Sequence, residues 1–241
     1  MCFRISVVVS KDKLVSRVNA IMAQITIKYD FDSFLYHASG FNHPKLPVVT
    51  DNALTEMKWG LIPAWVKDQQ KAKEMADITL NAKMETAFEK PSFKSAIASR
   101  RCLIPATGFF EFHDYNSKKY PFFITTANEE LFFLGGIWES WADKTSGELI
   151  DTFSILTTEA NSLMAKIHNS KMRMPVIIPP GKEATWLSKT LTKPQIEAFQ
   201  EPFDESKLKA YPISRLITSR TDDPNTPRVI EPFEYAELGT F

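Results

Sequence analysis

The chain has 241 residues, 44% of them hydrophobic and 24% charged, and its 29 basic residues balance its 29 acidic ones, so net charge gives no sign of nucleic-acid binding. This globular balance suits one large domain or two small ones, and two cysteines, Cys2 and Cys102, exclude a disulfide framework and a zinc ligand set. No apolar run approaches the ~18–20 residues of a membrane span. The opening ISVVVS is too short for a signal peptide, so we expect a soluble cytoplasmic protein, or a nuclear one in a eukaryote.

Hydrophobic periodicity predicts the elements of the first hundred residues. Alternating apolar residues predict a strand over 3–9, and apolar residues at helical spacing predict a helix over 14–25. Further along we expect a loop leading into a strand over 36–50, a short strand over 56–63 that ends at Pro63, and a helix over 86–101 that is interrupted at Pro91.

Four runs rich in aromatic and β-branched residues follow, at 102–113, 120–126, 131–141 and 152–158. Strands at this rhythm indicate an antiparallel sheet or barrel. Asn161 suits the N-cap of a short helix, Pro175 favours an extended segment, and helices are expected at 181–188 and 192–200. Because no repeat, linker or phosphate-binding glycine loop occurs, the simplest interpretation is a single α+β domain.

Cys2 is the first residue that could carry chemistry. A cysteine near a terminus is commonly a small buried hydrophobe, but removal of Met1 would leave Cys2 with an α-amine and a thiol on adjacent carbons. With pKa values near ~7.7–8.0 and ~8.5, part of each group is reactive at neutral pH. Such an aminothiol captures aldehydes, because the amine forms an imine and the thiolate then closes a five-membered thiazolidine ring.

Three further candidates each have an ordinary explanation as well. Asn81 could simply begin a helix, and His168, which follows a short helix, could be structural. Glu111 alternates with Phe110 and Phe112, so it either faces solvent or points inward, where desolvation would raise its pKa and suit it to proton transfer. No HxH or HExxH pattern occurs, and we expect no metal site.

Seven collinear stretches together resemble the SOS-response-associated peptidase (SRAP) family, the abasic-site processing proteins. They are MCFR (1–4), WGLIPAW (59–65), NAKMET (81–86), KPSFKSA (90–96), RCLIPATGFFEF (101–112), IHNSKMRMPVII (167–178) and YPISR (211–215). They span nearly the whole chain, and their combination is far more specific than any one of them.

The resemblance implies one SRAP-type domain over residues 1–241, with an α+β fold, an antiparallel, barrel-like β core and peripheral helices. It implies removal of Met1, with autoproteolysis as a route, and covalent capture of abasic sites in single-stranded DNA by Cys2; a lyase activity is also compatible. In this scheme Asn81 holds the reacting centre, Glu111 handles protons at the amine and imine, and His168 is acid or base at the sugar hydroxyl. No cofactor or membrane is implied, and we expect a monomer that associates with the nucleoid on damaged DNA.

The resemblance also suggests where DNA is held. The expected phosphate contacts are Arg4, Lys83, Lys94 and Arg173, the apolar or stacking surfaces are Pro44, Trp65 and Phe112, and Thr157 adds a polar contact. Stacking contributes ~1–3 kcal/mol per base and tolerates any sequence, which suits a lesion found anywhere. Solvated helix faces and core positions are the alternative explanations for these residues.

Four positions depart from the family pattern. They are Phe3 in place of a usual Gly, Lys83 in place of an Arg, Val66 where some relatives carry a second Trp, and the longer spacing between His168 and Arg173. A lysine grips phosphate with less geometric control than an arginine. None of the four alters the proposed catalytic set, so activity remains the expectation.

Two other functions remain open. An N-terminal-nucleophile amidohydrolase resembling a glutamine amidotransferase would use the amine as base and form a thioester on the thiol, and glutamine hydrolysis would reveal it. A non-enzymatic single-strand-binding module would bind intact and abasic strands equally and leave no adduct.

Overall fold

A five-stranded barrel forms the core of the computed structural model, which describes residues 2–30, 32–128 and 130–238. Its strands are, in order around the barrel, β5 (Ala53–Trp59), β4 (Lys45–Val49), β7 (Arg101–Ala106), β10 (Phe132–Ala142) and β11 (Leu149–Glu159). Neighbours in this order are antiparallel, whereas the closing pair β11–β5 is parallel and places Thr152 opposite Lys58 and Phe153 opposite Trp59. The predicted α+β fold with a barrel-like core is confirmed, and its seam is parallel.

Short strands extend the barrel sheet at its margins. They are β2 (Thr26–Ile27) beside β5, β13 (Ile177–Ile178) beside β10, and β6 (Asn81–Lys83) and β12 (Arg173–Pro175), which both pair with β11. At Thr157 of β11, β6 pairs at Lys83 and β12 pairs at Pro175. Residues from two distant parts of the chain therefore meet along β11.

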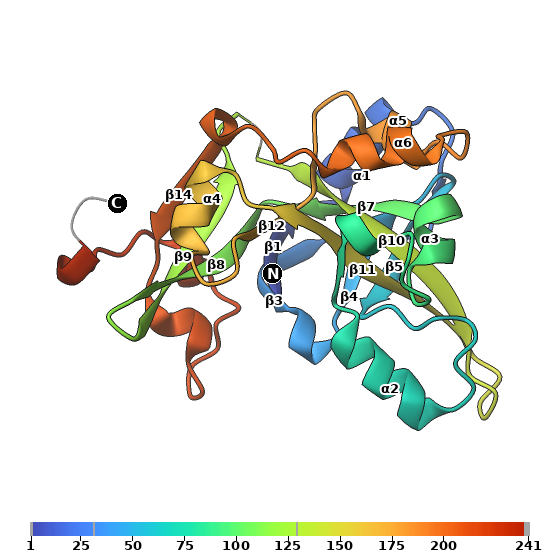
Figure 1. Ribbon diagram of the computed structural model, residues 1–241, viewed down its shortest axis with the longest axis horizontal. Coiled ribbons are helices and arrows are strands. Elements are labelled where there is room, and N and C mark those ends of the chain that lie inside the picture. The colour runs from blue at the N-terminus through green and yellow to red at the C-terminus, as the bar shows by residue number, and fades with distance from the viewer. Residues whose placement is uncertain (1, 31, 129, 239–241) are drawn as a thin grey trace.

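A second, fully antiparallel sheet lies beside the barrel (Figure 1). Its order is β14 (Leu208–Pro212), β9 (Lys118–Thr126), β8 (Gly108–Tyr115), β1 (Arg4–Val9) and β3 (Ser33–Ser39). The chain passes from the barrel to this sheet at Thr107, whose amide donates to the Ser6 carbonyl over 2.8 Å. Gly108 must lack a side chain, because a Cβ there would lie 2.1 Å from the Phe123 ring.

Six short α-helices surround the sheets. They are α1 (Lys11–Ile21), α2 (Gln69–Ile78), α3 (Lys94–Ser99), α4 (Ser162–Ile167), α5 (Glu183–Leu187) and α6 (Lys193–Glu197) in the described part of the chain. Figure 1 shows α1, α5 and α6 on one side of the barrel and α2 on the opposite side. None of these helices has the length and apolar character that crossing a bilayer requires.

Most sequence-based elements are confirmed, although several differ in their extent. The Asn161 side chain caps α4 as predicted, and both expected helices after residue 180 form. The predicted loop after residue 36 is wrong, because β3 continues to Ser39, and the run 102–113 is two strands that divide at Thr107. The segment 56–63 leaves its strand at Trp59, and the predicted helix over 86–101 is reduced to α3.

Trp59 holds the seam of the barrel. Its side chain is fully buried, its indole Nε1 donates to the Leu80 carbonyl over 2.8 Å, and its ring stacks on Phe153 at 6.0 Å between centroids. Gly40 allows this packing, since a Cβ there would lie 3.2 Å from the indole. The first tryptophan of WGLIPAW is therefore structural, while Trp65 at its other end is 51% exposed.

We predict that Trp59→Ala lowers the free energy of unfolding by about 3–5 kcal/mol, because it leaves a large cavity at the seam. Urea denaturation measures this change. Trp65→Ala is the matched control and should change the free energy of unfolding by less than about 0.5 kcal/mol. Equal effects of the two variants would contradict the structural role of Trp59.

Candidate active site

The first strand holds Cys2 inside the molecule. Cys2 lies two residues before Arg4, where β1 begins, and Ile5 of β1 lies opposite Phe109 of β8. The Cys2 side chain is fully buried, and its Sγ lies 3.9 Å from the Arg4 carbonyl oxygen, to which it donates. Burial raises the pKa of the Cys2 thiol, and the charge of Glu111 adds to the shift. The thiol is therefore protonated at neutral pH and needs a base before it can react.

Glu111 points inward from β8 rather than toward solvent. Its side chain is buried, whereas Phe110 and Phe112 pack on the other face of the strand against Ile213 and its neighbours. Burial raises the pKa of Glu111 from 4.5 to about 8, although the nearby Arg4 cation acts in the opposite direction. Near neutral pH this carboxyl group is therefore mostly protonated, yet it can exchange its proton readily.

His168 stands at the C-terminal end of α4, which packs against β8 and β12. Its Nδ1 lies 2.8 Å from the carbonyl oxygen of Arg173, so Nδ1 carries the hydrogen and Nε2 carries the lone pair. The same Nδ1 lies 3.6 Å from Oε1 of Glu111. Burial lowers the pKa of His168 to about 4, so the imidazole is neutral at pH 7.

Glu111 and His168 line a cavity of about 400 Å³ together with Arg4 and Phe112, two of the expected DNA contacts. Phe3, Lys119 and Lys171 also line it and were not among the expected site residues. Lys171 lies in the segment between His168 and Arg173 that is longer than in the family pattern. This extra length was the sequence feature that could have predicted Lys171 as a residue of the site. Nothing in the sequence around Lys119 marked it as a site residue.

Arg4 brings a cation to the rim of this cavity. Its guanidinium carbon lies 5.6 Å from the Phe41 ring centroid and 5.3 Å from that of Phe112, and Phe3 packs against Phe41 at 5.0 Å. Such contacts hold a weakly hydrated guanidinium against aromatic faces. The group stays charged, although burial lowers the pKa of Arg4 from its ordinary value.

Asn81 lies on β6, opposite Ile155 of β11. Its amide nitrogen and oxygen are both buried, and neither has a hydrogen-bond partner among the described residues. Buried amides are almost always hydrogen-bonded, because an unmade bond costs about 1–3 kcal/mol. An amide left in this state is suited to a ligand, although Asn81 does not line the Glu111–His168 cavity in the described part of the chain.

The expected DNA contacts divide into exposed and buried groups. Trp65, Lys83 and Lys94 are exposed, on the segment after β5, on β6 and at the start of α3. Pro44 is half-buried, and its carbonyl accepts from the Trp59 amide. The remaining two, Thr157 and Arg173, contact each other on β11 and β12.

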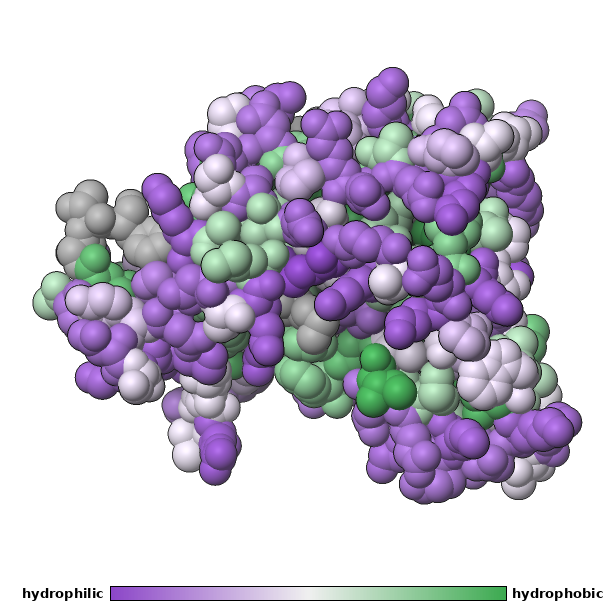
Figure 2. Space-filling model, in the orientation of Figure 1, coloured by the Kyte–Doolittle hydropathy of each residue, from purple (hydrophilic) through white to green (hydrophobic). Residues whose placement is uncertain are grey.

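Hydrophobic residues gather below the centre of the face shown in Figure 2, bordered by hydrophilic residues above and below. Phe41 and Trp65 are among the exposed large hydrophobic residues of the molecule, at 55% and 51%. Arg4 lies over the Phe41 ring at 5.6 Å, and an exposed aromatic side chain beside a basic one is typical of single-strand binding surfaces.

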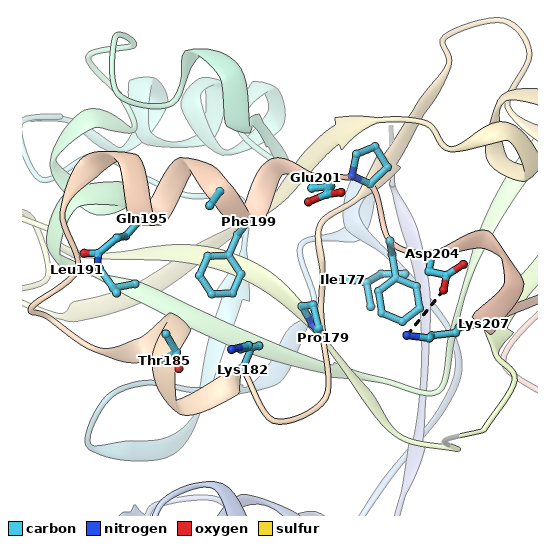
Figure 3. A pocket seen from close by; sticks show the side chains of 13 residues that line it. Ile177, Pro179, Lys182, Thr185, Leu191, Gln195, Phe199, Glu201, Asp204 and Lys207 are labelled. Carbon is cyan, nitrogen blue, oxygen red and sulfur yellow. Dashed lines mark ion pairs between the residues drawn. The ribbon is translucent and has the colours of Figure 1, made fainter.

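A second, larger cavity lies elsewhere. It measures about 600 Å³ and is lined by Leu191, Phe199 and Phe203, with Lys182 and the Asp204–Lys207 ion pair at its margin (Figure 3). None of the expected site residues lines it. The smaller cavity is the better candidate, because it holds the two titratable groups whose pKa values are shifted in opposite directions. No cluster of three or more potential metal ligands exists among the described residues.

Comparison with known proteins identifies the family. Residues 1–220 match the family described as SOS response associated peptidase (SRAP). The chain belongs to this family. Over 216 residues it is 35% identical to the abasic site processing protein YoqW of Bacillus subtilis, a match that covers 85% of this chain and 92% of YoqW.

More distant SRAP relatives extend to vertebrates, and a solved structure shares the fold. The chain is 30% identical over 206 residues to the abasic site processing protein HMCES of Gallus gallus, which covers 77% of this chain and 59% of HMCES. A crystal structure of a protein from Bacteroides thetaiotaomicron is 35% identical and superposes with a TM-score of 0.87, covering 97% of this chain and 100% of that one.

We predict that the free energy of unfolding of the wild type falls, relative to that of Glu111→Gln, by about 1 kcal/mol as pH rises from 7 to 8. Glu111 keeps its proton in the folded state up to about pH 8, whereas the unfolded state releases it near 4.5. The folded state therefore binds more protons, and this stabilisation is fully present below 4.5 and lost as pH passes 8. Urea denaturation across this range measures the slope.

Glu111→Gln is the control, because its amide does not titrate and the slope should flatten. The lowered pKa values of His37 and His168 act in the opposite direction and still contribute near pH 7, but they are the same in both proteins, so the difference between the two slopes reports Glu111. Identical slopes for the wild type and Glu111→Gln would show that the pKa of Glu111 is not raised in the folded state.

Proposed function

We propose that this chain processes abasic sites in single-stranded DNA by forming a thiazolidine through the amine and thiol of Cys2, after removal of Met1. The observation that carries the proposal is the buried pair of Glu111 and His168, 3.6 Å apart, together with the effect of the Glu111 charge on the buried Cys2 thiol. YoqW and HMCES, the relatives described above, are abasic site processing proteins, which agrees with it.

The first step joins the amine to the aldehyde of the ring-opened deoxyribose. The nitrogen of Cys2 attacks C1′, and the resulting hydroxyl leaves as water after taking a proton from the Glu111 carboxyl. An iminium ion and a carboxylate remain. A carboxyl with a pKa of about 8 suits this step, because at neutral pH it holds the proton that the departing water needs.

The second step closes the ring. The Glu111 carboxylate takes the thiol proton, and the sulfur then bonds to C1′ while the iminium electron pair returns to nitrogen. Glu111 ends as it began, and the net change is aldehyde plus aminothiol to thiazolidine plus water. Both nucleophiles belong to one residue, so ring closure has the advantage of an intramolecular reaction.

His168 would act at the sugar. The closed hemiacetal opens when its hydroxyl loses a proton and its ring oxygen gains one, and a neutral imidazole with the lone pair on Nε2 can accept the first proton. Asn81 would hold the reacting centre, since its buried amide has both a donor and an acceptor to offer.

Removal of Met1 would precede capture. Hydrolysis of the Met1–Cys2 peptide bond consumes one water and releases methionine and the Cys2 amine, and a thiol beside a carboxyl group can supply both nucleophile and proton carrier. The name of the family, which is that of a peptidase, agrees with such a step.

DNA would reach the site along the face that carries Arg4, Lys83 and Lys94. These cations would neutralise phosphates, while Trp65 and Phe112, with Pro44, would present apolar surface to bases beside the lesion. Thr157 is buried behind this surface, so its contribution would be to hold its neighbours in place.

We predict that Cys2→Ala abolishes the DNA adduct that survives denaturing electrophoresis, because only Cys2 supplies the thiol for ring closure. Affinity for single-stranded DNA should stay within about threefold, since the phosphate contacts remain. Cys102→Ala is the control, because that thiol is buried in the barrel strand β7 and should be dispensable. An undiminished adduct from Cys2→Ala would refute the mechanism.

We predict that Glu111→Gln and His168→Ala each slow adduct formation by about 10²–10⁴-fold without abolishing binding, because each removes one proton carrier. Single-turnover rates between pH 5.5 and 8.5 measure this. For the wild type we expect a fall in rate above about pH 8, where Glu111 loses the proton that the departing water requires. Wild-type rates from both variants across this range would show that neither group takes part.

A further inference from the structure

His43 donates hydrogen bonds from both of its ring nitrogens. Its Nδ1 lies 2.7 Å from the carbonyl oxygen of Trp59, and its Nε2 lies 2.8 Å from Oδ1 of Asp77. A carbonyl oxygen and a carboxylate oxygen only accept, so each ring nitrogen carries a hydrogen and the ring is an imidazolium cation. Because only 14% of the His43 side chain is exposed, this cation is a cross-link within the protein.

The end of α2 is a favourable place for such a cation. Asp77 lies in the last turn of α2, where the helix dipole is negative and an acidic side chain is unfavourable. The last four residues of the helix, 75–78, include no Lys or Arg. His43 supplies the positive charge from outside the helix. Gly60 makes room for the ring, since a Cβ there would lie 2.8 Å from Nδ1.

The loop that carries His43 also holds the start of the chain. His43 directly follows the 3₁₀ helix Gly40–Asn42, which connects β3 to β4. The Gly40 amide donates to the carbonyl of Phe3 over 2.9 Å, and the Phe3 ring packs on an aromatic ring of the same loop at 5.0 Å between centroids. Since Phe3 directly follows Cys2, the loop fixes the segment that carries the thiol.

The other end of the cross-link leads into Asn81. α2 ends at Ile78 and β6 begins at Asn81, so only two residues connect the helix to the strand. The carbonyl of one of them, Leu80, accepts from the indole of Trp59 over 2.8 Å. With so short a connection, a shift of the end of α2 would move Asn81.

We propose that His43 is a positioning residue, whose imidazolium joins the loop that holds Cys2 to the end of α2 and so sets the place of Asn81 relative to the thiol. This inference rests on the proposed function. His43 does not line the Glu111–His168 cavity in the described part of the chain, so it acts through the segments that it joins. A neutral imidazole has a single N–H and would release one of them.

Asp77→Asn tests the cross-link by removing the charge that holds the imidazolium. We expect the rate of adduct formation at saturating abasic DNA to fall by about tenfold, because small displacements of reacting groups are costly. Affinity for intact single-stranded DNA should stay within about twofold. His43→Gln should have the same effect, and the double variant should be no slower than the slower single variant, because residues that act as one unit are not additive.

Glu74→Gln is the matched control. It removes the same charge from the same helix, where Glu74 is exposed and accepts from Gln70 over 2.9 Å, and it should leave rate and affinity unchanged. Urea denaturation of every variant measures the effect on folding. If Asp77→Asn and His43→Gln lower the free energy of unfolding but keep the wild-type rate at saturation, His43 only stabilises the fold and the inference is overturned.

Nuclear magnetic resonance tests the cross-link without DNA. The chain has four histidines, so nitrogen-15 labelling of histidine gives few signals, and His43→Gln identifies those of His43. At pH 6 we expect slowly exchanging hydrogens on both ring nitrogens in the wild type and in Glu74→Gln. In Asp77→Asn the Nε2 hydrogen has lost its charged acceptor and should exchange faster. The amide signals of Phe3 and Asn81 should shift in Asp77→Asn and not in Glu74→Gln.

A wild-type Nε2 without a hydrogen would overturn the inference, as would a loss of DNA affinity in Asp77→Asn with an unchanged rate at saturation. If the wild type forms no adduct, the proposed function fails, and the amide signals of Phe3 and Asn81 then decide the inference. Signals that shift in Asp77→Asn alone support it, and signals that stay in place overturn it.

Discussion

The pairing of β1 inside the second sheet is the constraint on which the site depends. Segments outside regular structure are often mobile, yet Cys2, the residue proposed to react, lies only two residues before Arg4, where β1 begins. β1 has a strand on each side, β8 and β3, and these hold it along its length. The hydrogen bonds between β1 and its two neighbouring strands thus fix the position of Cys2, although Cys2 lies near one end of the chain.

Burial then sets the protonation states of the groups around Cys2. The thiol and the Glu111 carboxyl keep their protons, and His168 stays uncharged, because each charged form would lose its hydration. Arg4 contributes a fixed positive charge that is partly shielded between Phe41 and Phe112. In the proposed reaction the intermediate is a cation, and the carboxylate that Glu111 becomes when it gives up its proton would stabilise that cation as a close ion pair.

Local patterns were sufficient for much of the fold and for part of the site. The alternation in β1 and the capping residue Asn161 act over a few neighbours, so sequence alone revealed them. Alternation also placed Glu111 opposite Phe110, but it could not say which face was buried, because that depends on the barrel packed behind β8. The proposed catalytic roles came from the family resemblance, and local pattern alone would have left each of these residues ambiguous.

Contacts between segments far apart in the sequence could not be predicted from local sequence patterns. The Glu85–Arg173 ion pair joins residues far apart in the sequence, and nothing near either one indicates its partner. The parallel closure of the barrel is of the same kind, because strand patterns carry no information on direction. The loop expected after residue 36 was wrong because the strand there is completed by pairing with β1, which neither segment reveals by itself.

The seam of the barrel has a consequence for the order in which the molecule folds. Closure depends on Phe153 meeting Trp59, so most of the intervening chain must be gathered before this contact forms. Bringing distant segments together lowers the conformational entropy of the chain before any contact between them provides stabilising free energy. Such pairings therefore form slowly. The strands β6 and β12 need β11 as their template. The segments that carry Asn81 and His168 would thus reach their final positions late in folding. In a newly made chain the barrel strands would form before the proposed active site is assembled.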